Sequence, residues 1–397
     1  MRPNRALNRT RAYAASFSRS SVGAGRLAFE RVGFEHVVGG VNMLSVTRFL
    51  FLIVAVCSLS ATVVLAQAPA KTKHVGYLVW SSPSARGSLE QSLLDGMKQE
   101  GYVEGKNLLV ERRYVDGGTF DEVRAAAREL AALNLDAIVS TCSYSTAAAK
   151  EATSTSRTPV VMAFVSDPVG QGLIASFRNP GGNITGLSSQ AEDTIPKMLQ
   201  FISQVVPPGT RIAVLYHATN PVHPRLWDRL QQAAKERGAT VVRIDFSDSG
   251  DLVAAFDKIG EQRAGALLVL PDDNTTFNVR KLLVALVNRQ RIPAIFGPRD
   301  FVDIGGLMSY GANMGESYRQ TAKYLDKVLA GVKPARLPVA QPTRFEFVVN
   351  LGAAKALGMT IPHDLAVRAD DVVRDAPAAS TYVAPPAGWK PQPSDRM

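Results

Sequence analysis

The chain has 397 residues, enough for two domains at the usual 100–200 residues per domain. Its 46% hydrophobic and 20% charged residues are ordinary for a globular protein. Eight of the 45 basic and two of the 35 acidic side chains lie within residues 1–68, so the remainder carries only +4, without long basic runs, which disfavours a nucleic-acid partner.

The amino-terminal segment predicts export. Residues 1–42 are rich in Arg and Gly without periodicity, and we interpret them as an upstream extension from a misread start. Residues 43–68 combine one arginine, a mostly apolar run and a final Ala-Gln-Ala, which is typical of a signal peptide cleaved after Ala68. The alternative is a membrane anchor, since the run approaches the roughly 20 residues that span a bilayer. Cleavage leaves Cys142 as the only cysteine, which excludes an intramolecular disulfide.

From Lys71 onward, apolar runs of strand length alternate with amphipathic segments of helix length. We expect strands at 74–80, 108–114, 136–140, 159–165, 211–217, 239–246, 264–270, 292–296 and 307–310. We expect helices at 120–134, 225–238, 279–290 and 314–330. This alternation predicts an α/β protein with two Rossmann-like, doubly wound parallel-sheet lobes.

The chain is expected to pass between these lobes at three crossovers, near 187–189, 311–313 and 339–341. The predicted boundaries are 69–186 with 313–338 for lobe 1, 189–310 with 341–373 for lobe 2, and 374–397 for a disordered tail. A fold of this kind places any ligand at the carboxyl ends of its strands.

Residues 164–188 contain Gly170-x-Gly172-x-x-Ala175 after a predicted strand, a pattern found in dinucleotide-binding turns. We expect only a short helix over 170–177, and Asp167 places a carboxylate where a pyrophosphate needs N–H donors. The glycines therefore predict backbone turns and not a phosphate site, and we expect no cofactor.

Other motifs of catalysis or metal binding do not occur in the sequence. It contains no G-x-x-x-x-G-K-[ST], G-x-S-x-G or H-E-x-x-H pattern. His217 and His223 share a loop, but no Cys or acidic residue joins them before Asp228. We therefore expect a solvated histidine pair and not a zinc site.

Polar and aromatic side chains gather at the carboxyl ends of the predicted strands. In the first half these are Trp80, Ser81, Ser82, Thr141, Ser143, Tyr144, Ser166 and Asp167. In the second half they are Asn220, Asp272 and Asn274. A single polar turn residue is often merely solvated, but hydroxyl groups facing carboxylates suit a small polar ligand held in a cleft.

Specific roles follow for some of these residues. Asp272 is expected to pair with a ligand ammonium group, while Ser82, Thr141 and Ser143 donate to the ligand's carboxylate. Trp80 either stacks on the ligand or packs in the core, and both readings account equally well for its position.

Five segments carry a resemblance to a known family: 93–114, 164–188, 268–274, 306–314 and 348–362. In their order and spacing, residues 74–373 resemble the extracytoplasmic substrate-binding proteins of ABC importers, in the group that includes tryptophan/tyrosine-type binding proteins. One departure is "TCSYSTAA" after the third predicted strand, where the family more often has a Gly-Thr-Pro-Ala-Ala-like turn.

The resemblance implies a type I periplasmic binding protein fold that closes around its ligand, with a membrane permease and its ATPase as partners. Together with the residues above, it predicts a monomeric, non-catalytic periplasmic protein that delivers an amino acid, related zwitterion or organic acid to an ABC importer. Two alternatives remain open: an exported α/β enzyme acting on a small metabolite, and a sensory module of the same fold.

Overall fold

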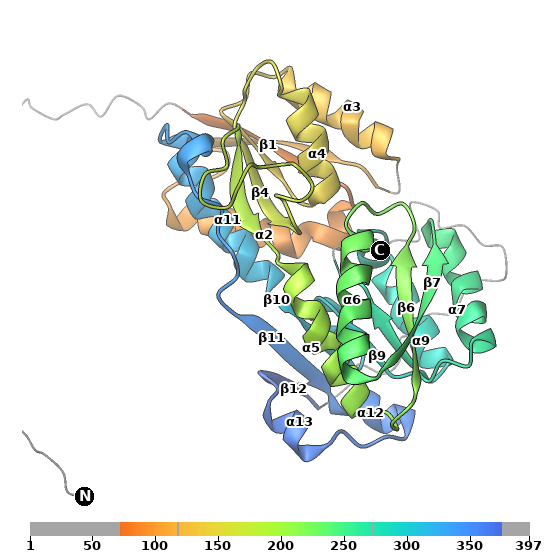
Figure 1. Ribbon diagram of the computed structural model, residues 1–397. Helices are drawn as coiled ribbons and strands as arrows, with labels where there is room; N and C mark the ends of the chain where they lie inside the picture. The colour runs from red at the N-terminus through yellow and green to blue at the C-terminus, as the bar shows by residue number, and fades with distance from the viewer. Residues whose placement is uncertain (1–71, 117–118, 272–273, 375–397) are drawn as a thin grey trace, which may run out of the picture. The chain divides into compact units, whose positions relative to one another are not determined.

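The computed structural model describes residues 72–116, 119–271 and 274–374. The expected upstream extension, the signal peptide, Asp272 and the tail beyond residue 374 lie outside these residues. Figure 1 shows the arrangement of the described elements.

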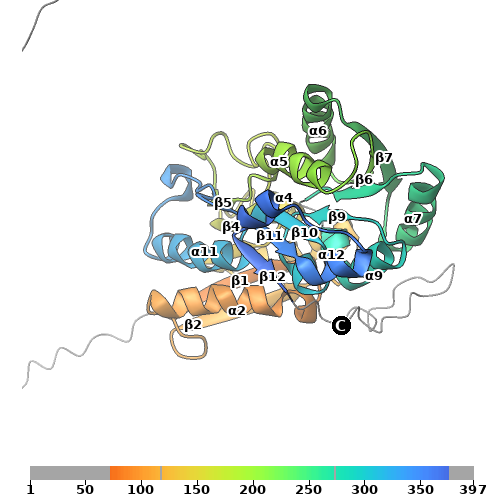
Figure 2. The ribbon, with the colours of Figure 1, turned by 90° about the horizontal axis from the view of Figure 1, so that it is seen from below.

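A five-stranded, entirely parallel sheet in the order β2-β1-β3-β4-β5 forms the centre of what we call the first lobe. Its strands are β1 (Lys73–Val79), β2 (Leu108–Tyr114), β3 (Ala137–Ser140), β4 (Val160–Val165) and β5 (Ile184–Ser188). Its helices are α2 (Pro83–Gln99), α3 (Phe120–Ala131), α4 (Ser143–Ala152) and α11 (Met314–Leu329). In Figure 2, α11 and α2 lie side by side, and the two helices are in contact.

A seven-stranded sheet in the order β12-β11-β10-β9-β8-β6-β7 forms the centre of the second lobe, and only its β10–β11 pair is antiparallel. Its strands are β6 (Arg211–His217), β7 (Thr240–Phe246), β8 (Ala266–Val269), β9 (Ala294–Phe296), β10 (Met308–Ala312), β11 (Phe345–Asn350) and β12 (Asp371–Val373). Its helices are α5 (Ala191–Gln204), α6 (His223–Arg237), α7 (Leu252–Glu261), α8 (Asn274–Asn278), α9 (Arg280–Arg289), α10 (Asp300–Asp303), α12 (Leu351–Leu357) and α13 (His363–Val367).

The apolar runs form strands because the sheets bury them under helices on both faces. In β3 all four residues are buried, and in β6 every residue after Arg211 is buried. The amphipathic helices pack their apolar faces onto these strands, as Val123 and Leu130 of α3 do against Ile138. The nine expected strands are all present, with ends shifted by at most two residues, and the expected α/β fold class is confirmed.

One expected element is wrong: residues 170–177 form turns and not a helix. The N–H groups of Leu173 and Ile174 both donate to the carbonyl oxygen of Pro168, and Gly172 has a φ of 66°. A left-handed residue at this place prevents the i to i−4 hydrogen-bond series from continuing. Within the described ranges, none of the helices has the length and apolarity needed to cross a membrane.

Candidate ligand-binding site

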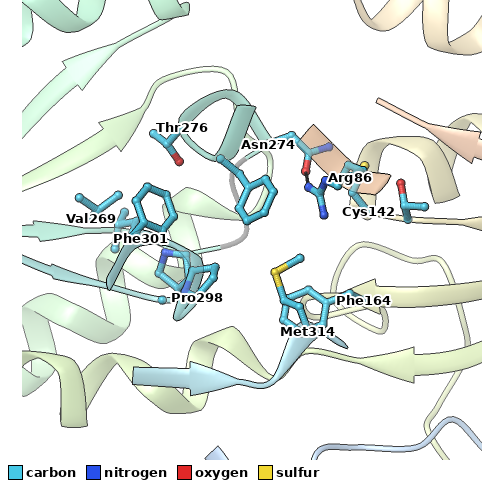
Figure 3. A pocket seen from close by; sticks show the side chains of 14 residues that line it. Arg86, Cys142, Phe164, Val269, Asn274, Thr276, Pro298, Phe301 and Met314 are labelled. Carbon is cyan, nitrogen blue, oxygen red and sulfur yellow. Dashed lines mark hydrogen bonds between the residues drawn. The ribbon is translucent and has the colours of Figure 1, made fainter. Parts of the chain in front are cut away.

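A pocket lies between the strand ends of the two lobes (Figure 3). Its cavity volume is about 30 Å³, which is room for about one water molecule, so a larger ligand can enter only when the lobes separate. Arg86 and Cys142 lie on one side, and Val269, Pro298 and Phe301 on the other. Residues distant in the sequence thus meet at the edge where open α/β sheets bind ligands.

Arg86 is the one charged residue in the wall of this pocket among the residues that the structure describes. It is 3% exposed, and its Nη2 donates to Oδ1 of Asn274 at 2.7 Å (Figure 3). The described residues supply no hydrogen-bond partner for Nε or Nη1. They also place no carboxylate within ion-pair distance of Arg86. A buried cation with unpaired donors is unfavourable, so an acceptor from outside would stabilise this arrangement.

The carboxylate of Glu90, one helical turn further along α2, already forms an ion pair with another residue. Arg112 donates to Glu90 through Nε at 2.5 Å, and the hydroxyl of Tyr114 also donates to it. Burial raises the pKa of Tyr318, and the positive charge of nearby Arg86 acts against that rise. A neutral tyrosine hydroxyl carries no charge that could pair with the guanidinium of Arg86, and the buried carboxyl of Asp300 interacts electrostatically with both Arg280 and Arg86 without forming an ion pair with Arg86.

Aromatic and apolar side chains make up much of the remaining wall. The guanidinium carbon of Arg86 lies 4.3 Å from the ring centre of Phe277, and that of Arg280 lies 4.5 Å from the same ring. Cations are attracted to the face of an aromatic ring at such distances. With Phe164 and Met314 also in the wall, the pocket offers one cationic end and an apolar remainder.

A wider hollow, with a cavity volume of about 300 Å³, lies where the chain passes between the lobes. Its charged groups already pair with other residues: Arg344 with Asp370 at 2.5 Å, and Glu346 with Arg299 at 2.6 Å. A ligand would have to compete with these pairs. We therefore place the candidate site at the pocket that contains Arg86.

Trp80, Ser81 and Tyr144, all expected at the site, make hydrogen bonds to the other lobe. The hydroxyl of Ser81 donates to Oδ1 of Asn278 at 2.6 Å, and the carbonyl oxygen of Trp80 accepts from the same side chain at 3.4 Å. The hydroxyl of Tyr144 donates to the carbonyl oxygen of Thr219 at 3.2 Å. The rings of Trp80 and Tyr144 meet edge to face, with centres 4.5 Å apart. The lobes are therefore joined by hydrogen bonds at the strand ends.

Two expected hydroxyl groups serve the local structure of the first lobe. The Ser82 hydroxyl accepts from the N–H of Ala85 at 3.1 Å and caps α2. Thr141 lines the pocket, but its hydroxyl donates to the carbonyl oxygen of Leu78 at 3.2 Å. A ligand could bind the Thr141 hydroxyl either as an additional partner or by displacing the carbonyl oxygen of Leu78.

Ser143 and Ser166 are both buried, and each is hydrogen-bonded to a side chain from another segment of the chain. The Ser143 hydroxyl accepts from Nε2 of Gln171 at 3.1 Å, and the Ser166 hydroxyl donates to Oε2 of Glu192 at 3.0 Å. Neither residue lines the pocket.

The remaining expected residues divide between the two lobes. Asp167 forms an ion pair with Arg225 of the second lobe. Asn220 is buried and accepts from the N–H of Val222 at 3.0 Å, whereas Asn274 lines the pocket and orients Arg86.

The histidine pair is buried and not solvated as expected. His217 is 4% and His223 1% exposed, and Nδ1 of His223 accepts from the N–H of His217 at 2.8 Å. His217 also stacks on Phe246, with ring centres 4.8 Å apart. The expectation failed because His217 is the last residue of β6 and His223 the first residue of α6, and both are buried with these elements instead of lying in an exposed loop. In the part of the chain that the structure describes, no three His, Cys, Asp or Glu residues are grouped to hold a metal ion.

A family model described as "ABC transporter substrate binding protein" matches residues 75–373. The chain belongs to this family. The tyrosine-binding protein of Clostridioides difficile (strain R20291) is 25% identical over 292 residues, which cover 73% of this chain and 82% of that relative.

Solved structures are similar to this substrate-binding protein over 76% of its chain. A conserved domain protein from Vibrio cholerae is 29% identical with a TM-score of 0.70, and it is covered completely, at 100%. The ABC domain from Streptococcus pneumoniae in complex with L-Trp is 24% identical with a TM-score of 0.69 and is also covered to 100%. The expected family and the type I periplasmic binding protein fold are confirmed.

Membership of the family has direct consequences for function. The substrate-binding protein takes a small-molecule ligand and has an ABC transporter as its partner. Members of this family bind substrates for transport and typically act outside the cytoplasm. The chain is thus a solute-binding protein.

Arg86 is the charged residue of the substrate-binding protein's pocket that sequence reasoning missed, and the apolar residues of the wall were not expected there either. A signal was present: Arg86 lies on the same face of α2 as Ala85, Leu89 and Leu93, all of them buried. A charged residue within the apolar stripe of an amphipathic helix is buried on folding and needs a reason to be there. Arg86 lies in the first turn of a helix, and the residues expected at the site were those at the ends of strands.

Glu192 yields a prediction about pH. Burial raises its pKa, against the effect of its backbone hydrogen bond and the Ser166 hydroxyl. Because the folded protein holds this proton more tightly than the unfolded chain, stability is lost as pH rises through the folded-state pKa. We expect Glu192→Gln to raise the melting temperature at about pH 8 and to do so less at about pH 4, where the wild-type carboxyl is protonated. Thermal unfolding at both pH values measures this, and an equal gain at both would contradict it.

Proposed function

We propose that this protein binds an amino acid whose carboxylate pairs with Arg86, and that it delivers this ligand to an ABC importer. One observation carries the proposal: a buried guanidinium in the pocket wall has two N–H-bearing nitrogens without a partner among the described residues. Its one hydrogen bond there, to Asn274, fixes the side chain at the pocket.

A ligand carboxylate would supply the negative charge and the hydrogen-bond acceptors that the Arg86 guanidinium lacks. A guanidinium presents donors in a planar fork that matches the two oxygens of a carboxylate. Such charge-assisted hydrogen bonds are stronger than neutral ones, especially where closure excludes water. A receptor of micromolar affinity needs about −8 kcal/mol, to which this pair would contribute a substantial part.

The remainder of the pocket favours an apolar or aromatic ligand side chain. Phe164, Phe277, Phe301 and Met314 line it, and burying apolar surface against them is favourable. The relative named a tyrosine-binding protein supports an amino acid as the class of ligand. We propose Asp272 as the partner of the ligand's ammonium group, which stays a prediction from the sequence.

The setting of this function is part of the proposal. We propose export to the periplasm through the signal peptide at 43–68, cleavage before Pro69, and action as a monomer beside a permease. The crossovers expected near 187–189, 311–313 and 339–341 would serve as the hinge on which the lobes close.

The test is a ligand panel read by thermal shift and mass spectrometry together. The purified protein is incubated with L-tyrosine, L-tryptophan, L-leucine, L-glutamate and L-lysine, and with L-tyrosine amide as the matched control. We expect an apolar or aromatic amino acid to raise the melting temperature and the amide to have little effect, because the amide lacks the charge that pairs with Arg86. Stabilisation by the amide equal to that by L-tyrosine would contradict the role of the carboxylate, and a new product mass would favour the enzyme alternative.

A further inference from the structure

An ion pair crosses between the lobes at Asp167 and Arg225. Asp167 follows β4 of the first lobe, and Arg225 lies in the first turn of α6 in the second lobe. The Asp167 carboxylate is 17% exposed and the Arg225 side chain 61% exposed. The other ion pairs cited for residues 72–116, 119–271 and 274–374 lie within one lobe, whereas this pair joins the first lobe to the second.

The local backbone is shaped to present this carboxylate. Asp167 has a φ of 38°, a left-handed conformation that is costly for a residue with a side chain. Its Oδ1 accepts from the N–H of Gly170 at 2.9 Å, which fixes the carboxylate, and its Oδ2 meets Arg225. Oδ1 thus forms a hydrogen bond within the turn, and Oδ2 forms the ion pair between the lobes.

Gly170 leaves the space that Arg225 occupies. A Cβ atom at this position would overlap the guanidinium of Arg225 and the carboxylate of Asp167. Gly170 does not have a positive φ, so its backbone conformation is open to alanine. Position 170 therefore needs a glycine because a side chain would collide with the ion pair. The backbone conformation at this position does not itself require a glycine.

The position of Arg225 on α6 supports the same reading. The amino-terminal end of a helix carries a partial positive charge, so a cation in the first turn is unfavourable unless an anion accompanies it. The N-cap residue of α6, Val222, provides no side-chain hydrogen bond. A carboxylate from the first lobe is thus favourable both to Arg225 and to the end of α6.

We infer that Asp167 and Arg225 form a latch that holds the lobes together before ligand arrives, and that Gly170 makes room for it. The latch supplies part of the free energy of closure. The apparent affinity for any ligand of the closed form rises with the population of that form. The inference concerns the ligand-free protein and does not depend on which ligand the protein binds.

Hydrogen exchange of the ligand-free protein tests the latch. The amides of α8 report lobe opening, because Asn274 and Asn278 bond to the first lobe and lie far from residue 225 in the sequence. We expect Arg225→Gln and Gly170→Ala to accelerate α8 exchange about two- to fivefold at low salt, the range for a partly exposed ion pair. Arg225→Lys should restore most of the protection. Wild type at about 0.5 M NaCl should exchange faster, because salt screens the pair.

Arg229→Gln is the matched control, since it removes the same charge from an exposed position one turn later on α6. It should leave α8 exchange unchanged. Unchanged exchange in Arg225→Gln would overturn the latch, and so would equal acceleration in Arg229→Gln. Acceleration in Arg225→Gln but not in Gly170→Ala would overturn the role assigned to Gly170.

Discussion

Replacing Arg86 with glutamine is expected to weaken amino-acid binding by about thirtyfold or more. Removing one member of a buried, hydrogen-bonded charge pair commonly costs about 2–5 kcal/mol, and 1.4 kcal/mol is a factor of ten in affinity. Glutamine retains a donor but no charge, so a ligand carboxylate would be buried without its counter-ion. Titration calorimetry with L-tyrosine, or with the panel amino acid that binds best, measures the loss.

The same substitution should not destabilise the ligand-free protein. Arg86 is 3% exposed and unpaired at two of its nitrogens, so the wild-type protein bears the cost of a buried charge that Arg86→Gln removes. We expect an unchanged or higher free energy of unfolding together with the loss of binding. Arg86→Lys keeps the charge but not the planar fork, and should bind with intermediate affinity. Binding of Arg86→Gln within threefold of wild type would show that the carboxylate sits elsewhere.

Replacing Gly186 with alanine is expected to cost about 3 kcal/mol or more of stability. Gly186 lies in the middle of β5 with a φ of 126°, which residues with a side chain rarely adopt. A Cβ there would overlap backbone atoms of Met162 in the neighbouring strand β4. Backbone strain and overpacking each cost about 1–3 kcal/mol, and a backbone neighbour has little freedom to move aside. Urea unfolding followed by circular dichroism gives the change in free energy.

Gly182→Ala is the control for this effect. Gly182 lies four residues earlier, has no positive φ, and a Cβ there would meet nothing within 4 Å. We expect its stability to stay within about 1 kcal/mol of wild type, since alanine also restricts the unfolded chain. Similar stability of the two variants would mean that β5 can shift away from β4. Failure of Gly186→Ala to fold while Gly182→Ala folds would agree with the expectation.

The order of residues along the chain was enough to predict the elements and the class of fold. Apolar runs such as 211–217 predict a strand whatever its neighbours, because a parallel strand covered on both faces must be apolar throughout. The spacing of apolar residues over 120–134 predicts a helix, which the structure contains as α3. These patterns involve residues that are close together in the chain, so a single sequence is enough to show them. The resemblance to ABC importer substrate-binding proteins was likewise carried by short segments in order.

Which polar groups meet became evident from the folded chain alone. It brings Arg86 of α2 to Asn274 of α8, 188 positions apart, and leaves Ser82 as a helix cap instead. It likewise explains Gly170, whose missing side chain admits Arg225 from the other lobe. A polar residue at a strand end can face a ligand, cap a helix or bond across the lobes, and its own sequence neighbourhood is the same in all three cases. The choice among them depends on which distant groups pack beside it, and that is settled only when the lobes are assembled.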